Sequence, residues 1–280
     1  MQLLKFFMVA EPQPGTLPIK MHKTTGPKPF ILLSSQRTGS AFLEQCLNSN
    51  KEIHCSGEIL LGYGGTYNKL PPKLFYKHRR FRTLWQALFS GAAFFPIKSI
   101  ENTWKINPDV KHIGFRLMYN QIKRDFRVKE YIKNLNNVNI IHLQRKNILK
   151  QFVSLKLMHN QSKYGRHSAH VTKRPPLVSI KINHKEAIKY IETTLLQRKN
   201  SLKLVNHLNI LSINYEDMIG SKGLNNDISN KISSFFKIND QSYVSNQVKM
   251  NSSNLKNLIT NYDELVEVFK KTSYAEWLND

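Results

Sequence analysis

Residues 30–43 constrain the fold more than any other stretch of this sequence. Residues 30–33 form a short, continuous apolar run, which is the pattern of a strand buried in a parallel sheet. Small and polar residues follow at 34–40, and from Ala41 the apolar spacing becomes helical. A strand, a small-residue loop and a helix in this order direct backbone N–H groups and the positive end of a helix dipole at an anion. The stretch therefore predicts a phosphate-binding loop.

The side chains of this loop add donors that suit an oxyanion. Arg37 supplies a guanidinium, and Thr38 and Ser40 supply hydroxyl groups. The loop is not a Walker A motif, because GxxxxGK[ST] is absent and no lysine follows Gly39. An ordinary strand-to-helix turn remains the alternative interpretation of this segment alone. The predicted anion-binding residues are Ser35, Gln36, Arg37, Thr38, Gly39, Ser40 and Ala41.

A second strand-to-helix stretch carries another basic residue. Residues 139–143 read as a short apolar strand, Arg145 stands where it ends, and Ser154 follows about two turns into the next helix. In an open parallel sheet, ligands bind outside the carboxyl ends of the strands. Arg145 and Ser154 are thus placed to hold a second phosphate beside the first. A solvated helix start with a core-facing serine is the alternative.

Together, the two stretches resemble the sulfotransferases that use 3′-phosphoadenosine 5′-phosphosulfate (PAPS). The resemblance implies that the first loop binds the 5′-phosphosulfate and that Arg145 and Ser154 bind the 3′-phosphate. The closer resemblance is to bacterial carbohydrate sulfotransferases of the Nod-factor and lipopolysaccharide type. Four further stretches are similar to that group: Ser56-Gly57-Glu58-Ile59, residues 113–119, residues 214–218 and residues 261–278.

The resemblance implies an α/β protein with three α/β/α layers around a central parallel sheet, the P-loop NTPase-like sulfotransferase fold. The alternation of strand and helix patterns also predicts a parallel sheet covered on both faces. Expected strands lie near 30–34, 52–55, 111–116, 139–143 and 209–214, and expected helices near 40–49, 124–135, 147–159, 184–207, 224–236 and 262–271.

Residues 1–29, rich in proline, are predicted to be a flexible basic lead-in, and residues 30–280 a single sulfotransferase domain. Residues 60–108 and 161–183 are too irregular for the core and follow ligand-facing strand ends. We expect these two insertions to form the acceptor site.

The implied reaction transfers a sulfuryl group from PAPS to a hydroxyl of a carbohydrate or glycolipid by in-line displacement. PAPS is the expected co-substrate, and no metal is expected because arginine can neutralise the leaving bisphosphate. Related bacterial enzymes place a glutamate at Glu58, which is the predicted general base, with Arg37 and Arg116 as the other predicted catalytic residues. His54 and His112 are rival bases because histidine titrates closer to neutrality.

Two arginines stand where related enzymes often have lysine, Arg37 in the first loop and Arg116 in the middle of the chain. Arginine stabilises developing negative charge but does not give up a proton. The second motif is one residue longer than in the cytosolic hormone-type enzymes, so Lys146 is a further candidate for the phosphate. Lys249 lies in a polar loop where family members approach the nucleotide, and it is also predicted to bind the cofactor.

Two other features have structural interpretations. Tyr215-Glu216-Asp217 is predicted to have a structural role at the end of the fifth strand. Cys46 falls on the apolar side of a helix, so we expect a reduced core thiol and no disulfide framework.

The formal net charge of +23 bears on the partners. A basic nucleic-acid-binding protein is one alternative function, but the basic residues are scattered along the chain, and PAPS or an anionic glycolipid would be attracted equally. The densest cluster could hold a sugar, lie against lipid headgroups or be a solvated face; it comprises Lys73, Lys77, His78, Arg79, Arg80 and Arg82, interleaved with aromatic residues. We expect a carbohydrate or glycolipid acceptor and no specific nucleic acid.

A Mg²⁺-nucleotide-dependent kinase of related P-loop fold is a second alternative. It would require a Walker lysine and a Mg²⁺ carboxylate, which the sequence does not offer. No apolar run reaches the roughly 18 residues that a bilayer span needs. The protein is therefore predicted to be cytoplasmic and to have no transmembrane helix. Peripheral contact of the protein with an anionic membrane surface is a further alternative.

Overall fold

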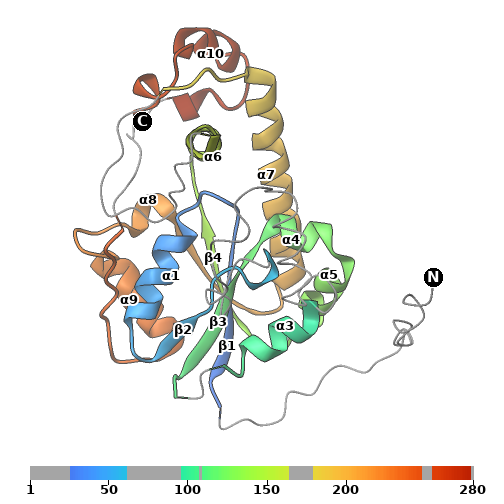
Figure 1. Ribbon diagram of the computed structural model, residues 1–280, viewed down its shortest axis with the longest axis vertical. Coiled ribbons are helices and arrows are strands. Elements are labelled where there is room, and N and C mark those ends of the chain that lie inside the picture. The colour runs from blue at the N-terminus through green and yellow to red at the C-terminus, as the bar shows by residue number, and fades with distance from the viewer. Residues whose placement is uncertain (1–25, 62–95, 107–108, 164–178, 248–253, 279–280) are drawn as a thin grey trace, which may run out of the picture.

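Five parallel strands form one sheet in the order β2-β3-β1-β4-β5 (Figure 1). The structure is a computed structural model, and it describes residues 26–61, 96–106, 109–163, 179–247 and 254–278. The apolar runs of β1 and β4 are buried because helices cover both faces of the sheet. The strands are β1 (Lys28–Ser34), β2 (Ile53–Cys55), β3 (His112–Met118), β4 (Asn139–Gln144) and β5 (Asn209–Asn214).

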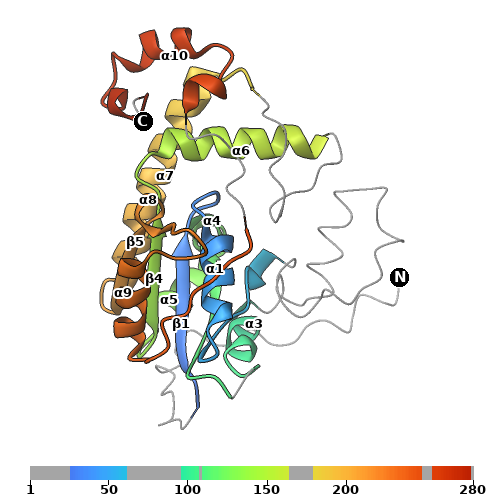
Figure 2. The same ribbon diagram turned by 90° about the vertical axis from the view of Figure 1, so that its left-hand side faces the viewer.

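Helices cover the two faces of this sheet, which confirms the predicted three-layer α/β/α architecture (Figures 1 and 2). Helices α1 (Ser40–Ser49) and α9 (Asn226–Phe236) pack their buried residues on one face. The other face is covered by α3 (Pro96–Thr103), α4 (Tyr119–Arg124), α5 (Phe126–Lys133) and the C-terminal end of α7 (His184–Val205).

A third apolar cluster lies beyond the carboxyl ends of the strands (Figures 1 and 2). It joins α6 (Ile148–Lys163), the first half of α7 and α10 (Tyr262–Phe269). The remaining short elements are η1 (Ile59–Leu61), α8 (Tyr215–Met218), η3 (Leu255–Asn257) and η4 (Ala275–Leu278). This cluster fixes α6 across the edge of the sheet where ligands bind in parallel α/β folds.

The strand order places a topological switch point between β1 and β4. The chain runs from β1 through β2 and β3 on one side of β1, and then crosses to β4 and β5 on the other. Ligands of open α/β sheets bind in the crevice outside the strand ends at such a point. The loops after β1 and β4 are the two that carry the sequence motifs.

Several expected boundaries change in the structure. The helix predicted near 124–135 is α5, which Asp125 caps by accepting from Arg127 N at 3.0 Å, and a short helix that was not predicted, α4, precedes it at 119–124. Strand β1 begins at Lys28, two residues before the predicted strand. The prediction that residues 60–108 lie wholly outside the core is wrong, because α3 buries Ile100 against the sheet.

Some predictions fall outside the described residues: Lys249, the basic cluster at 73–85, and most of the lead-in and of both insertions. Both Cys46 and Cys55 are buried free thiols. Within the described ranges, no helix is both long and apolar enough to cross a membrane.

Candidate active site

The loop between β1 and α1, residues 35–39, turns its backbone carbonyl groups toward the protein. Three consecutive carbonyls each accept a side-chain hydrogen bond: Ser35 from Thr38 Oγ1 at 2.8 Å, Gln36 from Gln151 Nε2 at 2.7 Å and Arg37 from Arg145 Nη1 at 3.5 Å. In a trans peptide the C=O and the following N–H point in opposite directions. Within the described residues, no acceptor meets the backbone N–H groups of residues 36–42. The loop therefore presents a row of donors suited to an anion.

The backbone conformation of the loop explains this arrangement. Arg37 and Gly39 both have positive φ, 64° and 82°. At Gly39 a Cβ atom would also lie 2.5 Å from the Tyr215 ring, so the position requires glycine. The first turn of α1 has neither a side-chain cap nor an acidic residue. The positive end of its dipole is thus left for a ligand.

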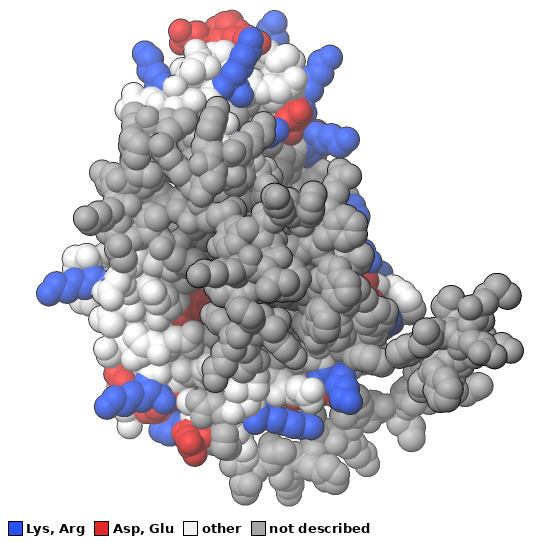
Figure 3. Space-filling view, in the orientation of Figure 1, with Lys and Arg blue, Asp and Glu red and all other residues white. Residues whose placement is uncertain are grey.

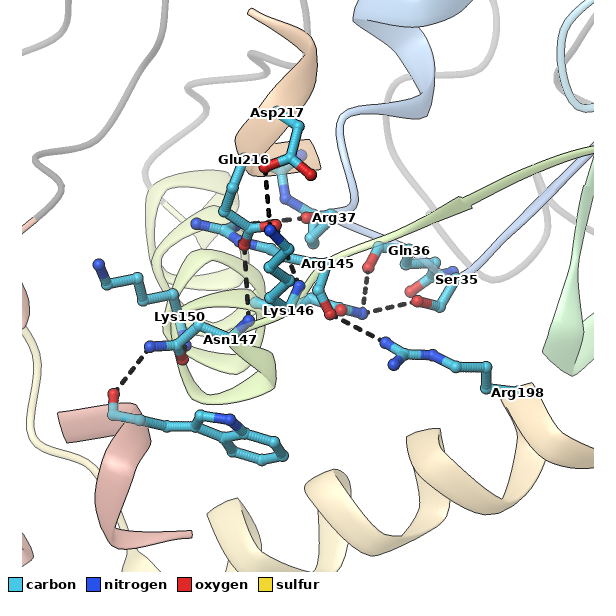
Figure 4. Close-up of polar contacts among 12 residues, drawn as sticks. Ser35, Gln36, Arg37, Arg145, Lys146, Asn147, Lys150, Arg198, Glu216 and Asp217 are labelled. Carbon is cyan, nitrogen blue, oxygen red and sulfur yellow. Dashed lines mark hydrogen bonds and ion pairs between the residues drawn. The ribbon is translucent and has the colours of Figure 1, made fainter. Parts of the chain in front are cut away.

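Two guanidinium groups converge on this loop from adjacent strand ends (Figure 4). Arg37 Nε donates to Ser154 Oγ at 3.1 Å, although 117 positions separate the two residues. Arg145 is only 13% exposed, and its Nη1 reaches the Arg37 carbonyl. Burial lowers the pKa of Arg37, and the like charge of Arg145 lowers it further. An anion between them would relieve both effects.

Two residues of α8, Tyr215 and Glu216, contact the Arg145 guanidinium. Its guanidinium carbon lies 4.7 Å from the centre of the Tyr215 ring, and its Nε lies 3.8 Å from Glu216 Oε1. Glu216 also accepts from the backbone N–H of Lys146 at 3.0 Å, at the start of α6. The Lys146 side chain pairs with Asp217 at 2.9 Å (Figure 4). The predicted structural role of residues 215–217 thus extends to the site itself.

A partly buried ion-pair cluster lies beside the first turn of α1. Arg116 Nε is 2.5 Å from Glu44 Oε2, and Arg116 Nη1 is 3.6 Å from Glu58 Oε1. The same Nη1 donates to Ser40 Oγ at 3.4 Å. Glu58 Oε2 is buried and has no hydrogen-bond partner among the described residues. The cluster connects the predicted base to the predicted anion-binding helix through Arg116.

Two carboxylates share one guanidinium in this cluster, and both are perturbed. Burial raises the pKa of Glu58 above its ordinary value, while Arg116 acts in the opposite direction. Burial also raises the pKa of Glu44, with Arg116 lowering it and Glu58 raising it. A partly buried carboxyl group with one unpaired oxygen is suited to accept a proton.

The rival bases occupy other surroundings. His112 stands at the first residue of β3, opposite the end where the loops meet, and its Nε2 lies 2.8 Å from the Phe236 carbonyl. Burial lowers the pKa of His112 to about 4. His54 on β2 contacts Ser56 Oγ at 3.1 Å, and burial lowers its pKa.

The structure brings together most of the predicted residues, with one change of role. The Thr38 hydroxyl, predicted to face the anion, instead donates to the Ser35 carbonyl. Ser35 Oγ accepts from Gln151, and Ala41 lies in the uncapped first turn of α1. The roles assigned to Arg37, Arg145 and the remaining residues stay predictions.

Sequence reasoning missed several side chains that shape the site. Gln151 on α6 is fully buried and contacts the loop, and Tyr190 on α7 contacts Gln151 at 3.0 Å. Arg198 on α7 donates to the Arg145 carbonyl at 2.9 Å (Figure 4). The one available signal was a glutamine three residues before Ser154 on an otherwise apolar helix face. Among the described residues, no cluster of three or more His, Cys, Asp or Glu could hold a metal ion.

Comparison with known proteins gives a structural likeness without a sequence match. No protein-family model matches the sequence, and no curated protein matches it significantly. A sulfotransferase from Alicyclobacillus acidocaldarius has a TM-score of 0.47 at 11% identity, over 91% of this chain and 96% of that one. The sulfotransferase domain from the curacin biosynthetic pathway has a TM-score of 0.41 at 15% identity, over 90% of this chain and 96% of that one.

Proposed function

We propose that this protein transfers a sulfuryl group from PAPS to a hydroxyl of a carbohydrate or glycolipid by in-line displacement. One observation carries the proposal. Two partly buried arginines, from strand ends 108 positions apart, meet at a loop whose backbone N–H groups lack acceptors within the described residues. Such a site suits a ligand with more than one negatively charged group. The sequence motifs favour PAPS among such ligands.

The donor set fits the two ends of PAPS. The backbone N–H groups after β1 and the start of α1 would hold the 5′-phosphosulfate. Arg145 and Ser154 would hold the 3′-phosphate, since no described residue forms a hydrogen bond with the buried Nε of Arg145. Ser154 Oγ accepts from Arg37, which leaves the Ser154 hydroxyl hydrogen to donate.

The chain's own residues supply the acid–base chemistry. PAPS, when bound, provides the sulfuryl group and a bisphosphate leaving group. Glu58 is the base that removes the proton from the acceptor hydroxyl, because its Oε2 is unpaired and burial raises its pKa. Arg116 orients Glu58 and links it to Ser40, and Arg37 stabilises negative charge at the loop.

The proposed acceptor class rests on the sequence resemblance and on charge. On the face that Figure 3 shows, the lysine and arginine side chains of the described residues are dispersed and do not gather into one stripe. A duplex-binding protein usually masses such charges on one face. A dispersed positive potential instead raises the encounter rate with any anionic substrate. It is also compatible with peripheral contact with an anionic membrane.

Adenosine 3′,5′-bisphosphate is expected to raise the melting temperature by several degrees without Mg²⁺, and ATP with Mg²⁺ much less. Only the bisphosphate fills both phosphate sites, and a ligand at 100 times its Kd stabilises by about 2.7 kcal/mol. Differential scanning fluorimetry in 0.3 M salt checks this and suppresses nonspecific binding. Equal stabilisation by the two ligands would favour the kinase alternative, and stabilisation by DNA alone would favour nucleic-acid binding.

Glu44→Gln is expected to move the acidic limb of the pH–rate profile to lower pH. Removing Glu44 deletes a like charge near Glu58 and leaves Arg116 to pair with Glu58 alone, and both changes lower the pKa of Glu58. Because the base acts when deprotonated, activity then appears at lower pH. Glu52→Gln is the matched control, since Glu52 is also 22% exposed and pairs with Lys111 at 2.6 Å elsewhere. A shift toward higher pH would contradict the assignment of Glu58.

A further inference from the structure

The face of α6 that meets the β1–α1 loop carries three residues at helical spacing. Gln151, Ser154 and Met158 are three and four positions apart, so they share one side of the helix. Ser154 and Met158 both contact the Arg37 guanidinium, the latter through Sδ at 3.8 Å from Nη1. Gln151 begins this face and is 0% exposed. The loop folds against this face of α6.

An obligate acceptor fixes the orientation of the Gln151 carboxamide. Its Nε2 lies 2.7 Å from the Gln36 carbonyl, 2.8 Å from Ser35 Oγ and 3.0 Å from the Tyr190 hydroxyl. A carbonyl only accepts, so Nε2 and not Oε1 must face Gln36. One amide hydrogen serves the Gln36 carbonyl, and the other is left for the two hydroxyl groups. The side chain thus joins α6, α7 and the loop at a buried point.

The carboxamide oxygen of Gln151 indicates that packing alone does not require a glutamine at this position. Within the described part of the chain, Gln151 Oε1 is buried without a hydrogen-bond partner. An unpaired buried oxygen disfavours the folded state. An apolar side chain of similar shape would avoid this cost, so the donor at Nε2 is the feature that distinguishes glutamine here.

Holding the Gln36 carbonyl determines where the next N–H points. The peptide is planar and trans, so the N–H of Arg37 is directed away from Gln151 and α6. Arg37 itself has a φ of 64°, a region that non-glycine residues occupy only when their surroundings impose it. The bond from Gln151 is one of three that fix consecutive loop carbonyls.

We infer that Gln151 is a positioning residue that holds the β1–α1 loop in its anion-binding conformation. This inference rests on the proposed function and names a residue through which the nucleotide site is preorganised. Gln151 acts through the loop, because both of its amide hydrogens are used within the protein. Its loss therefore weakens the hold of the loop on the 5′-phosphosulfate end more than the hold of Arg145 and Ser154 on the 3′-phosphate.

The test compares Gln151→Met with Gln121→Met. Gln121 on α4 is also buried, at 3% exposure, accepts from Met118 N at 2.9 Å, and likewise leaves one carboxamide atom unpaired. Isothermal titration with adenosine 3′,5′-bisphosphate is expected to show a Kd about tenfold or more higher for Gln151→Met and within about twofold of wild type for Gln121→Met. Competition titrations should show a larger loss for adenosine 5′-phosphate than for adenosine 3′-phosphate. Gln151→Asn, which withdraws the amide by one methylene, carries the same expectations if Gln151→Met does not fold.

The outcomes separate the two proposals. If wild-type protein does not bind the bisphosphate, the proposed function fails first. If wild-type protein binds it and the Gln151 variants bind equally well, the positioning role is wrong. An equal loss for Gln151→Met and Gln121→Met, or equal losses for the 5′- and 3′-phosphates, would reduce Gln151 to a general stabilising residue and also overturn the inference.

Discussion

Glu58→Gln is expected to lower turnover by about 100-fold or more while changing bisphosphate affinity by less than about threefold. The substitution keeps the size of the side chain and its contact with Arg116, but an amide cannot accept the acceptor's proton. Among the described residues, Glu58 is linked to the nucleotide side of the site through Arg116 and Ser40 alone, so we expect nucleotide binding to survive. Steady-state turnover and calorimetric Kd, measured on the same preparation, check both parts.

His54→Ala and His112→Ala are the companions to this experiment. Among the described residues, neither histidine forms a hydrogen bond or ion pair with Arg116 or Glu58, and His112 lies at the opposite end of β3. We expect the turnover of His54→Ala to stay within about fivefold of wild type. For His112→Ala, which removes a buried side chain, we expect a loss of folding stability. Near-normal turnover in Glu58→Gln together with loss in either histidine variant would reassign the base.

The elements nearest the site could be predicted because their signals are local. Helix α1 begins and ends at the predicted residues 40 and 49, since the preceding strand and Gly39 fix where helical spacing can start. Helix α4 was missed because its six residues follow β3 directly, and the capping bond of Asp125 that separates α4 from α5 is visible only in three dimensions. Helix α3 was missed because the surrounding stretch has no regular apolar spacing.

The site could be predicted only where the topology alone brings residues together. Arg37 and Arg145 follow adjacent parallel strands, so their proximity follows from strand order. The contacts of Gln151 with Tyr190 and of Arg145 with Tyr215 depend on how α6, α7 and α8 are rotated about their axes. Glu44 gave no signal because a glutamate on a helix normally faces water, and its burial follows from the guanidinium of Arg116 on β3.

Arg145→Ala is expected to weaken binding of adenosine 3′,5′-bisphosphate by about 2–3 kcal/mol, a factor of roughly 30 to 150. The guanidinium is 13% exposed, so its contact with a phosphate would be poorly screened by salt. Ser154→Ala should cost about 1 kcal/mol, because it removes a neutral hydroxyl donor. Adenosine 5′-phosphosulfate lacks the 3′-phosphate and should lose much less affinity than the bisphosphate in both variants, because Arg145 and Ser154 reach the 5′-phosphosulfate loop only through their contacts with Arg37.

Arg127→Ala is the charge-matched control, since it also lowers the net charge of +23 by one. Arg127 lies on α5 and pairs with Asp125, the residue that caps this helix. If mere basicity attracts the nucleotide, both arginine variants lose affinity equally, and the Arg145 assignment is wrong.

The stability of the ligand-free Arg145→Ala variant provides a second criterion. Arg145→Ala removes a stack on Tyr215 but also the like charge that lowers the pKa of Arg37, and these effects on the ligand-free protein oppose each other. A large loss of affinity with a small change in melting temperature would therefore identify Arg145 as a residue retained for the ligand, whereas a parallel loss of both would identify it as part of the scaffold.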